Sequence, residues 1–186
     1  MAKLIYSGFT SLDGYVADAS GDFDWAELDE DVFACINHRE RRVGTYLLGR
    51  RMYETMSVWE TPEVIPNPTA GMLGFVPIWQ AAEKIVYSTT LQAVSMDRAR
   101  LERTFDVDAV RQLKTAATRD IAVGGAALAA HAIRAGLVDE YHLLVAPIIA
   151  GGGNPYLPGD VTVKLELVDE RRFGNGLVYL QYRAKN

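Results

Sequence analysis

The stretch Ile121-Ala122-Val123-Gly124-Gly125-Ala126-Ala127 decides the fold predicted for this chain. Its apolar first part, residues 121–123, is typical of a buried strand, and the small residues over 126–135 predict a helix. The two glycines between them carry no side chain, so a ligand can reach the backbone and the first N–H groups of the helix. The turn therefore suits a phosphate or pyrophosphate group. The alternative is a close helix–strand contact that leaves no room for a Cβ atom.

Strands and helices alternate along most of the chain around this turn. Apolar runs predict strands over 3–9, 45–48, 84–88, 121–123 and 138–149. Helical spacing and terminal charges predict helices over 27–41, 107–117 and 126–135, with a helical turn near 52–56 and a short helix over 78–82. This alternation indicates an α/β fold with a mostly parallel sheet and helices on both faces.

Glycine and proline mark the remaining segments. Residues 60–77 contain several of both and predict a long surface loop. Two final strands, over 162–169 and 177–182, are joined through Gly174-Asn175-Gly176, which is a good hairpin signal. The hairpin predicts antiparallel strands at one edge, so the sheet as a whole is expected to be mixed.

Length and composition limit the classes of protein to which the chain can belong. Its 186 residues suit a single domain over 1–186, and the 49% of hydrophobic residues can form a core of two or three layers. The net charge of −5 disfavours a nucleic-acid partner. The single cysteine, Cys35, excludes an internal disulfide and a cysteine-rich zinc site, and the histidines share no metal-binding spacing. No apolar run has membrane-spanning length and the N-terminus enters a strand directly, so we expect a soluble, cytoplasmic protein without a metal.

Groups that can bind anions follow three of the predicted strands. Gly49-Arg50-Arg51 offers two arginines that can hold phosphate oxygens. The hydroxyls of Ser88 and Thr89 either donate to a phosphate or cap a turn, and the glycine pair at 124–125 follows a third strand. Ligands of open α/β sheets bind at the carboxyl ends of strands. One extended phosphorylated ligand would therefore contact all three segments if these strands are neighbours.

These segments, in this order, resemble the dihydrofolate reductase superfamily. The motifs are Leu47-Leu48-Gly49-Arg50-Arg51-x-Tyr53, Val86-Tyr87-Ser88-Thr89 and Val123-Gly124-Gly125. The resemblance is closer to the reductase (C-terminal) domain of the riboflavin-biosynthesis deaminase–reductase, RibD. It is carried there by Ser11-Leu12-Asp13-Gly14, Ser20-Gly21-x-x-x-Trp25 and Arg134-Ala135-Gly136-Leu137-Val138-Asp139-Glu140, and it covers nearly the whole chain. It implies a three-layer dihydrofolate-reductase-like fold.

The resemblance also implies NADPH as the cofactor and assigns residues to it. Thr10 would lie beside the nicotinamide through its backbone, and Trp25 would lie near the cofactor from a mobile loop. Arg50 and Arg51, which follow Gly49, would meet cofactor phosphates, including the 2′-phosphate that distinguishes NADPH from NADH. Ser88 and Thr89 would flank the adenosine end. The pyrophosphate would lie at the helix N-terminus formed by Val123, Gly124, Gly125, Ala126 and Ala127.

Departures from the riboflavin reductase fall at positions that serve its substrate. A lysine, a serine and a glutamate of that enzyme are replaced here by Ser7, Phe23 and Val123. Its Asp-Asp-Pro motif is replaced by the dihydrofolate-reductase-like Gly-Arg-Arg, and the zinc-deaminase motifs are absent. The chain therefore keeps the cofactor positions and changes the substrate positions, which disfavours a phosphoribosyl-aminouracil as the substrate.

Two carboxylates are candidates for proton transfer, because a reductase of this kind needs a proton source beside its cofactor. Asp13 is the first, and its alternative role is to stabilise an Asp-Gly turn. Glu27 is the second. It lies with Asp24 near the start of the first helix, where dihydrofolate reductases bind the pterin ring with one carboxylate. The alternative for these two acids is a solvated, acidic helix start.

The sequence thus predicts an NADPH-dependent reductase that transfers a hydride to a C=N or C=O bond of a small heterocyclic substrate. The substrate would lie between the Ser11–Trp25 loop and the first helix. The enzyme it resembles is 5-amino-6-(5-phosphoribosylamino)uracil reductase, with altered substrate positions. Two alternatives remain: a dihydrofolate reductase acting on a pterin, and an NADPH-binding module without catalysis. Apolar residues such as Leu143, Val145 and Leu180 predict a face that completes a homodimer.

Overall fold

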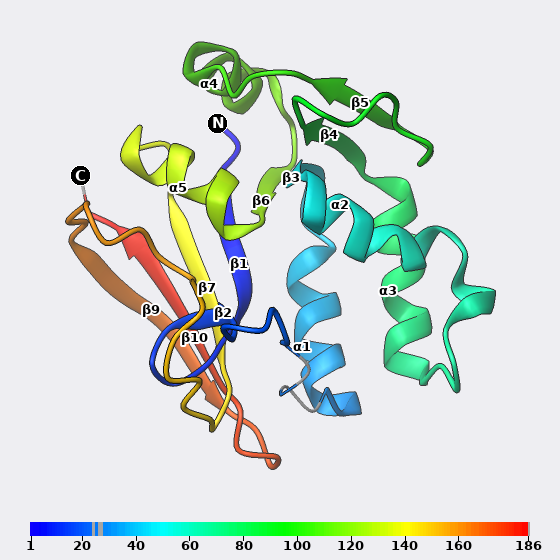
Figure 1. The fold of residues 1–186 in the computed structure, drawn as a ribbon, viewed down its shortest axis with the longest axis vertical. Coiled ribbons are helices and arrows are strands. Elements are labelled where there is room, and N and C mark those ends of the chain that lie inside the picture. The colour runs from blue at the N-terminus through cyan, green and yellow to red at the C-terminus, as the bar shows by residue number, and fades with distance from the viewer. Residues whose placement is uncertain (24, 26–27, 186) are drawn as a thin grey trace.

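The computed structural model describes residues 1–23, 25 and 28–185. Within these residues the chain forms an eight-stranded sheet in the order β5-β4-β3-β6-β1-β7-β10-β9 (Figure 1). The strands that pair in parallel are β1 (Leu4–Thr10), β3 (Val43–Gly49), β4 (Glu83–Tyr87), β5 (Ala99–Glu102), β6 (Asp120–Gly124) and β7 (Glu140–Val145). β10 (Val178–Ala184) runs antiparallel to β7 and to the edge strand β9 (Leu165–Arg172). The predicted mixed sheet with an antiparallel C-terminal edge is confirmed.

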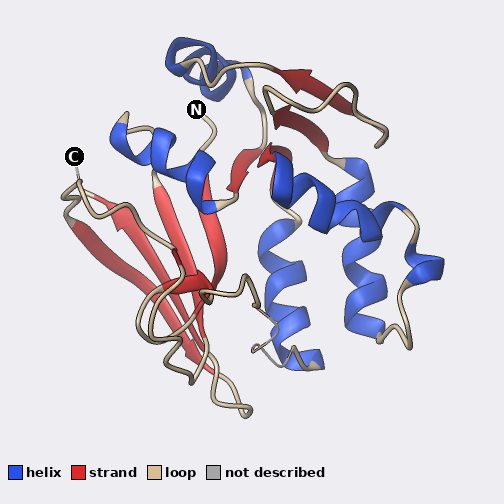
Figure 2. Ribbon diagram, viewed as in Figure 1, coloured by secondary structure: helices blue, strands red, loops and turns tan. Residues whose placement is uncertain are grey.

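Helices cover both faces of this sheet and complete three layers (Figure 2). One face carries α1 (Glu30–Glu40), α2 (Arg50–Met56) and α3 (Ala70–Ala81), and the other carries α4 (Val107–Ala116) and α5 (Ala126–Arg134). Short 3-10 turns, η1 (Ser57–Glu60) and η2 (Pro62–Val64), join α2 to α3. A small antiparallel pair, β2 (Tyr15–Ala17) with β8 (Asn154–Pro155), lies beside the carboxyl end of β1.

Alternate residues of the central strands point into two different apolar layers. Leu4, Tyr6 and Val123 belong to the layer that packs against α4 and α5. Leu48 and Ala122 belong to the layer beneath α2 and α3. Because strands buried on both faces need apolar residues at successive positions, the continuous apolar runs of β3 and β6 correspond to the centre of a parallel sheet. The three-layer α/β fold follows from this arrangement.

The predicted loop over 60–77 is wrong in its second half. Residues Ala70–Ala81 form helix α3, with Thr69 at its N-cap, so the short helix predicted over 78–82 is also misplaced. Pro77 lies inside this helix and removes one backbone hydrogen bond, at a cost of about 3 kcal/mol. Phe75 and Trp79 are 5% and 0% exposed, and burying two such side chains contributes a similar or larger stabilisation, about 1.5–3 kcal/mol each.

Other element boundaries differ by a few residues. α1 begins at Glu30, because the Asp29 side chain accepts the N–H of Val32 and so caps the helix there. β7 ends at Val145 rather than at 149, and β5 was not predicted. β5 is a short edge strand that alternates half-buried and exposed residues, which gives it a weak sequence signal.

Candidate functional site

The carboxyl ends of neighbouring parallel strands bring the predicted cofactor residues to one edge of the sheet. Gly49 pairs with Tyr87 in register, and Leu48 pairs with Gly124. β1 lies on the other side of β6 and ends at Thr10. The four segments that follow β4, β3, β6 and β1 therefore lie side by side, and a ligand that spans this edge meets all of them.

The two glycines between β6 and α5 serve different purposes. A Cβ atom at Gly124 would lie 2.9 Å from Met52 Cγ and 3.1 Å from Leu48 Cδ2, so this position needs glycine for packing. Gly125 has φ +96°, and a Cβ atom there would approach no side-chain or backbone atom closer than 3.7 Å. The close-contact alternative thus applies to Gly124, while Gly125 supplies the positive φ and the open approach to the backbone.

The N-terminus of α5 is open to a ligand. Gly125 is its N-cap and supplies no side-chain hydrogen bond, so the first N–H groups of Ala126, Ala127 and Leu128 are not capped by Gly125. Such groups and the helix dipole favour an anion. Val123 is 1% exposed, with its side chain in the core, so only its backbone is placed to contact a ligand.

Arg50 and Arg51 begin α2, at the carboxyl end of β3. Arg50 donates from Nε to Glu54 Oε1 (2.7 Å) and from Nη1 to Thr90 Oγ1 (3.0 Å). Arg51 is exposed, and within the described part of the chain it makes no ion pair or side-chain hydrogen bond. Arg51 therefore has all its donors available for an anionic ligand, whereas Arg50 is already oriented by a carboxylate and a hydroxyl.

The turn after β4 shows one of the two roles expected for its hydroxyls. Ser88 is 8% exposed, and its Oγ accepts the N–H groups of Thr90 (3.3 Å) and Leu91 (3.0 Å). Ser88 thus caps the turn, although its own hydroxyl proton remains available. Thr89 is exposed, and its side chain has no hydrogen-bond partner among the residues that the structure describes.

A further arginine at this turn was not found by sequence reasoning. Arg103 follows β5, and its Nη1 donates to the carbonyls of Ser88 (3.1 Å) and Leu91 (2.6 Å). β5 itself had no clear sequence signal. The pairing of β5 with β4, which brings Arg103 to this turn, becomes visible only in the structure.

Thr10, at the end of β1, and Trp25, in the segment before α1, lie on opposite faces of the sheet. Thr10 is 2% exposed and its hydroxyl donates to the carbonyl of Ser11 (3.1 Å). Trp25 is half-buried and packs with Phe9 against the apolar layer of α1, which includes Val32. Trp25 therefore occupies the α1 side of the sheet, where the substrate was expected to lie.

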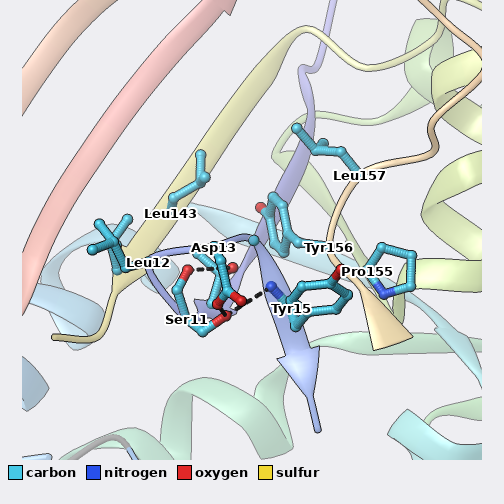
Figure 3. Close-up of a pocket in the computed structure, with 11 residues that line it drawn as sticks. Ser11, Leu12, Asp13, Tyr15, Leu143, Pro155, Tyr156 and Leu157 are labelled. Atoms are coloured by element: carbon cyan, nitrogen blue, oxygen red, sulfur yellow. Dashed lines mark hydrogen bonds between the residues drawn. The ribbon is translucent and has the colours of Figure 1, made fainter. Parts of the chain in front are cut away.

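Asp13 lies in the turn after β1 and its carboxylate is fully engaged. It accepts from Ser11 Oγ (2.7 Å), from the Ala150 N–H (2.9 Å) and from the Gly151 N–H (2.8 Å), as Figure 3 shows for Ser11. The hydrogen bonds from Ser11 and Ala150 lower the pKa of Asp13 below its ordinary value. A carboxyl group that stays ionised is a poor proton donor, so these contacts favour the turn-stabilising alternative. Its catalytic role stays a prediction.

Glu27, the second catalytic candidate, and its neighbour Asp24 lie outside the described residues. On the described part of α1, Glu30 and Asp31 in the first turn are exposed. Glu40 lies at the opposite end of the helix and accepts a hydrogen bond from Tyr46 (2.8 Å). None of these three places a buried carboxylate at the start of the helix.

A cavity of about 320 Å³ adjoins the Asp13 turn (Figure 3). Leu143 and Tyr156, which form part of its wall, belong to the apolar layer on the α5 side of the sheet. The cavity is therefore on the face opposite Trp25 and α1, and it is not the predicted substrate position. Its lining comprises Thr10, Ser11, Leu12, Asp13, Gly14, Tyr15, Leu143, Val145, Pro155, Tyr156 and Leu157.

The altered substrate positions carry no charge in the structure. Ser7 is half-buried on β1, Phe23 is 56% exposed and Val123 is buried in the core. Among the described residues, no three His, Cys, Asp or Glu side chains are grouped so that they could hold one metal ion. Within the same residues, no helix is long and apolar enough to cross a membrane.

Comparison with known proteins identifies the family. The family model "RibD C-terminal domain" matches residues 2–179, so the chain belongs to this family. A similar protein is the uncharacterized protein YyaP of Bacillus subtilis (strain 168). It is 25% identical over 182 residues, which cover 97% of this chain and 94% of YyaP.

Solved structures show the same fold. A putative riboflavin biosynthesis protein from Shewanella sp. PV-4 matches with a TM-score of 0.73 and 21% identity over all of both chains. The deaminase/5-amino-6-(5-phosphoribosylamino)uracil reductase of Thermotoga maritima matches with a TM-score of 0.68 and 17% identity. The match covers 99% of this chain and 57% of that one. Dihydrofolate reductase from Enterococcus faecalis, solved with NADP(H), matches with a TM-score of 0.64 and 14% identity. The match covers 99% of this chain and 97% of that one. The fold is thus shared by riboflavin-type reductases and dihydrofolate reductases.

Proposed function

We propose that this protein is an NADPH-dependent reductase that transfers a hydride to a C=N or C=O bond of a small heterocyclic substrate. The observation that carries the proposal is the meeting of three anion-binding segments at one edge of the sheet. They are the uncapped N-terminus of α5, the arginines that begin α2, and the turn after β4. Membership of the RibD C-terminal domain family supports the same conclusion.

The residues present fit a dinucleotide with an additional phosphate. Gly125 leaves the backbone open where a pyrophosphate would contact the helix N-terminus. Arg51, which has no partner among the described side chains, supplies a guanidinium for the 2′-phosphate, and Arg50 lies beside it. The nicotinamide would lie near Thr10, where it would supply the hydride when the cofactor is bound.

The substrate is expected to be less highly charged than a phosphoribosyl-aminouracil. Ser7, Phe23 and Val123 provide no cation for a substrate phosphate. The half-buried Trp25 and Phe9 form an apolar wall beside α1 that suits a flat ring. We therefore propose that the substrate is a heterocycle without a phosphate, held between the loop after β1 and α1.

A dihydrofolate reductase would need a carboxylate near the start of α1 to hold the pterin ring. Among the described acids there, Glu30 and Asp31 are exposed and Asp29 caps the helix, and Glu27 and Asp24 lie outside the described residues. A module that binds NADPH without catalysis would use the same cofactor edge and lack turnover.

Turnover separates these possibilities. The protein with NADPH is incubated with pterins, aminopyrimidine flavin precursors and quinones, and loss of the reduced nicotinamide absorbance is followed. We expect turnover of an uncharged heterocycle and weak turnover of the phosphoribosylated one. Dihydrofolate turning over fastest would favour a dihydrofolate reductase, and binding of NADPH without turnover of any compound would favour the non-catalytic module.

A further inference from the structure

Hydrogen bonds made by Ser88 fix the conformation of the turn over residues 88–91. Ser88 is buried, and its Oγ accepts the N–H groups of Thr90 and Leu91. The Ser88 N–H in turn donates to the carbonyl of Glu102 at 3.0 Å, which attaches the start of the turn to the end of β5. The N–H groups of Ser88, Thr90 and Leu91 therefore all have partners.

Two arginines from other segments of the chain donate hydrogen bonds to the same turn. The Nη1 atom of Arg103 donates to the first and last carbonyls of the turn, those of Ser88 at 3.1 Å and Leu91 at 2.6 Å. Arg50, from the start of α2, donates to Thr90 Oγ1 at 3.0 Å. This arrangement leaves the Thr89 side chain exposed and without a hydrogen-bond partner among the residues described.

We propose that Arg103 is a positioning residue for the adenosine end of the dinucleotide. The inference rests on the proposed NADPH binding, in which Ser88 and Thr89 flank the adenosine. Arg103 acts through the turn, because its guanidinium connects the two carbonyls that define the turn's ends. It also adds a positive charge beside the turn that Arg50 contacts, close to where the 2′-phosphate would lie.

The chemistry of arginine suits this role. Its guanidinium has five N–H donors in a planar arrangement, so Nη1 can serve both carbonyls while Nε and Nη2 remain available to solvent or to an anion. A turn that is already fixed does not have to be ordered when the ligand binds, and this lowers the cost of binding. Loss of Arg103 should therefore weaken binding more than loss of an equally charged residue on β5, the strand that precedes it.

Titration calorimetry with 2′,5′-ADP, the adenosine half of the cofactor with its 2′-phosphate, tests the inference. The matched control is R100M, because Arg100 lies on β5 just before Arg103, has a side chain that is 55% exposed, and pairs with the surface residue Glu102. We expect R103M to bind about tenfold more weakly than wild type, the loss of hydrogen bonds made by a charged group. R103K, which keeps charge and donors, should recover most of the affinity, and R100M should stay within about twofold of wild type.

The outcomes separate this inference from the proposed function. Arg103 is exposed, so the substitutions leave the core intact, and all variants are measured well below their melting temperatures. Wild-type binding with R103M equal to R100M would overturn the role of Arg103 and leave the NADPH proposal standing. A wild-type protein that binds neither 2′,5′-ADP nor NADPH would overturn both.

Discussion

Arg51 is the residue that we expect to bind the 2′-phosphate most directly. It is exposed and no described side chain pairs with it, so it can bind an anion without breaking an existing contact. Arg50 differs because Glu54 and Thr90 already hold it. The two arginines are adjacent in sequence, and only the structure distinguishes the free one from the paired one.

We expect R51M to lower the affinity for NADPH about tenfold and to leave the affinity for NADH within about twofold, because only NADPH carries the 2′-phosphate. The melting temperature without ligand should change little, since a substitution at an exposed site without partners is usually within about 0.5 kcal/mol. R183M is the control. Arg183 is exposed and pairs in register with Glu140 at the amino end of β7, far from the cofactor edge. Equal losses for NADPH and NADH in R51M would contradict this role.

Glu140 is the residue that should control stability in acid. It is 1% exposed, and burial alone would raise its pKa. Hydrogen bonds with His142 and Lys3, the latter also an ion pair of 2.6 Å, reverse this effect and lower the pKa to about 2. The folded pKa lies below the ordinary value of 4.5, so the stabilisation is present above that pH and is lost as the pH falls towards 2.

Urea unfolding between pH 2 and 7 should show this dependence. We expect E140Q to be less stable than wild type at neutral pH and to lose less stability as the pH falls from 5 to 2. E83Q is the control, because Glu83 is half exposed in a surface ion pair with Arg98. A wild-type pH dependence retained in E140Q would show that Glu140 is not its source.

At the scale of the elements, α1 and α3 approach closely because α3 contains glycine at the contact. A Cβ atom at Gly71 would lie 2.5 Å from Phe33 Cβ and 2.9 Å from Glu30 Oε2. The Gly71 carbonyl also accepts the side-chain amide of Asn37 at 2.9 Å. The helix pair therefore has no room for a larger residue at this position.

We expect G71A to lower the free energy of unfolding by about 1–3 kcal/mol, despite the higher helix propensity of alanine, because overpacking forces the helices apart. Chemical denaturation measures this change. G159A is the control, since a Cβ atom at Gly159 would have no neighbour within 4 Å. A G71A variant as stable as wild type would mean that α1 and α3 can separate without cost.

The sequence predicted the elements whose signals are local. The strand–glycine–helix segment at 121–127 and the hairpin at Gly174–Gly176 both depend on a few neighbouring residues, and both are present. α3 was missed because Pro77 and two glycines are local signals for a loop, whereas the burial of Trp79 that stabilises the helix is a long-range effect. Arg103 was missed for a similar reason, since its partners are 15 and 12 residues away across a strand pair.

At the scale of the whole molecule, one face of the sheet carries apolar residues that are only partly buried. Leu143 and Val145 of β7 and Leu180 of β10 are half-buried, and Leu167 of β9 is 50% exposed. Leu143 and Leu180 are partners in register across β7 and β10. We propose that a second copy of the chain covers this face, as the sequence predicts, because such a surface is unfavourable in water.

Light scattering at micromolar concentration should give the mass of a dimer. L180R should give a monomer that keeps NADPH binding, because Leu180 is on β10, which β1 and β7 separate from β6 and its glycine turn. L73R is the control, since Leu73 is 47% exposed on α3. A wild-type monomer at these concentrations would rule out the dimer.

The binding of NADPH is best tested by thermal unfolding with NADPH and with NADH at equal concentration. A ligand at 100 times its dissociation constant stabilises the folded state by about 2.7 kcal/mol, which for a chain of this size is a shift of roughly 5–11 °C. We predict a shift of this order with NADPH and a clearly smaller one with NADH. Equal shifts would contradict recognition of the 2′-phosphate by Arg50 and Arg51, and no shift with either nucleotide would contradict the proposed reductase.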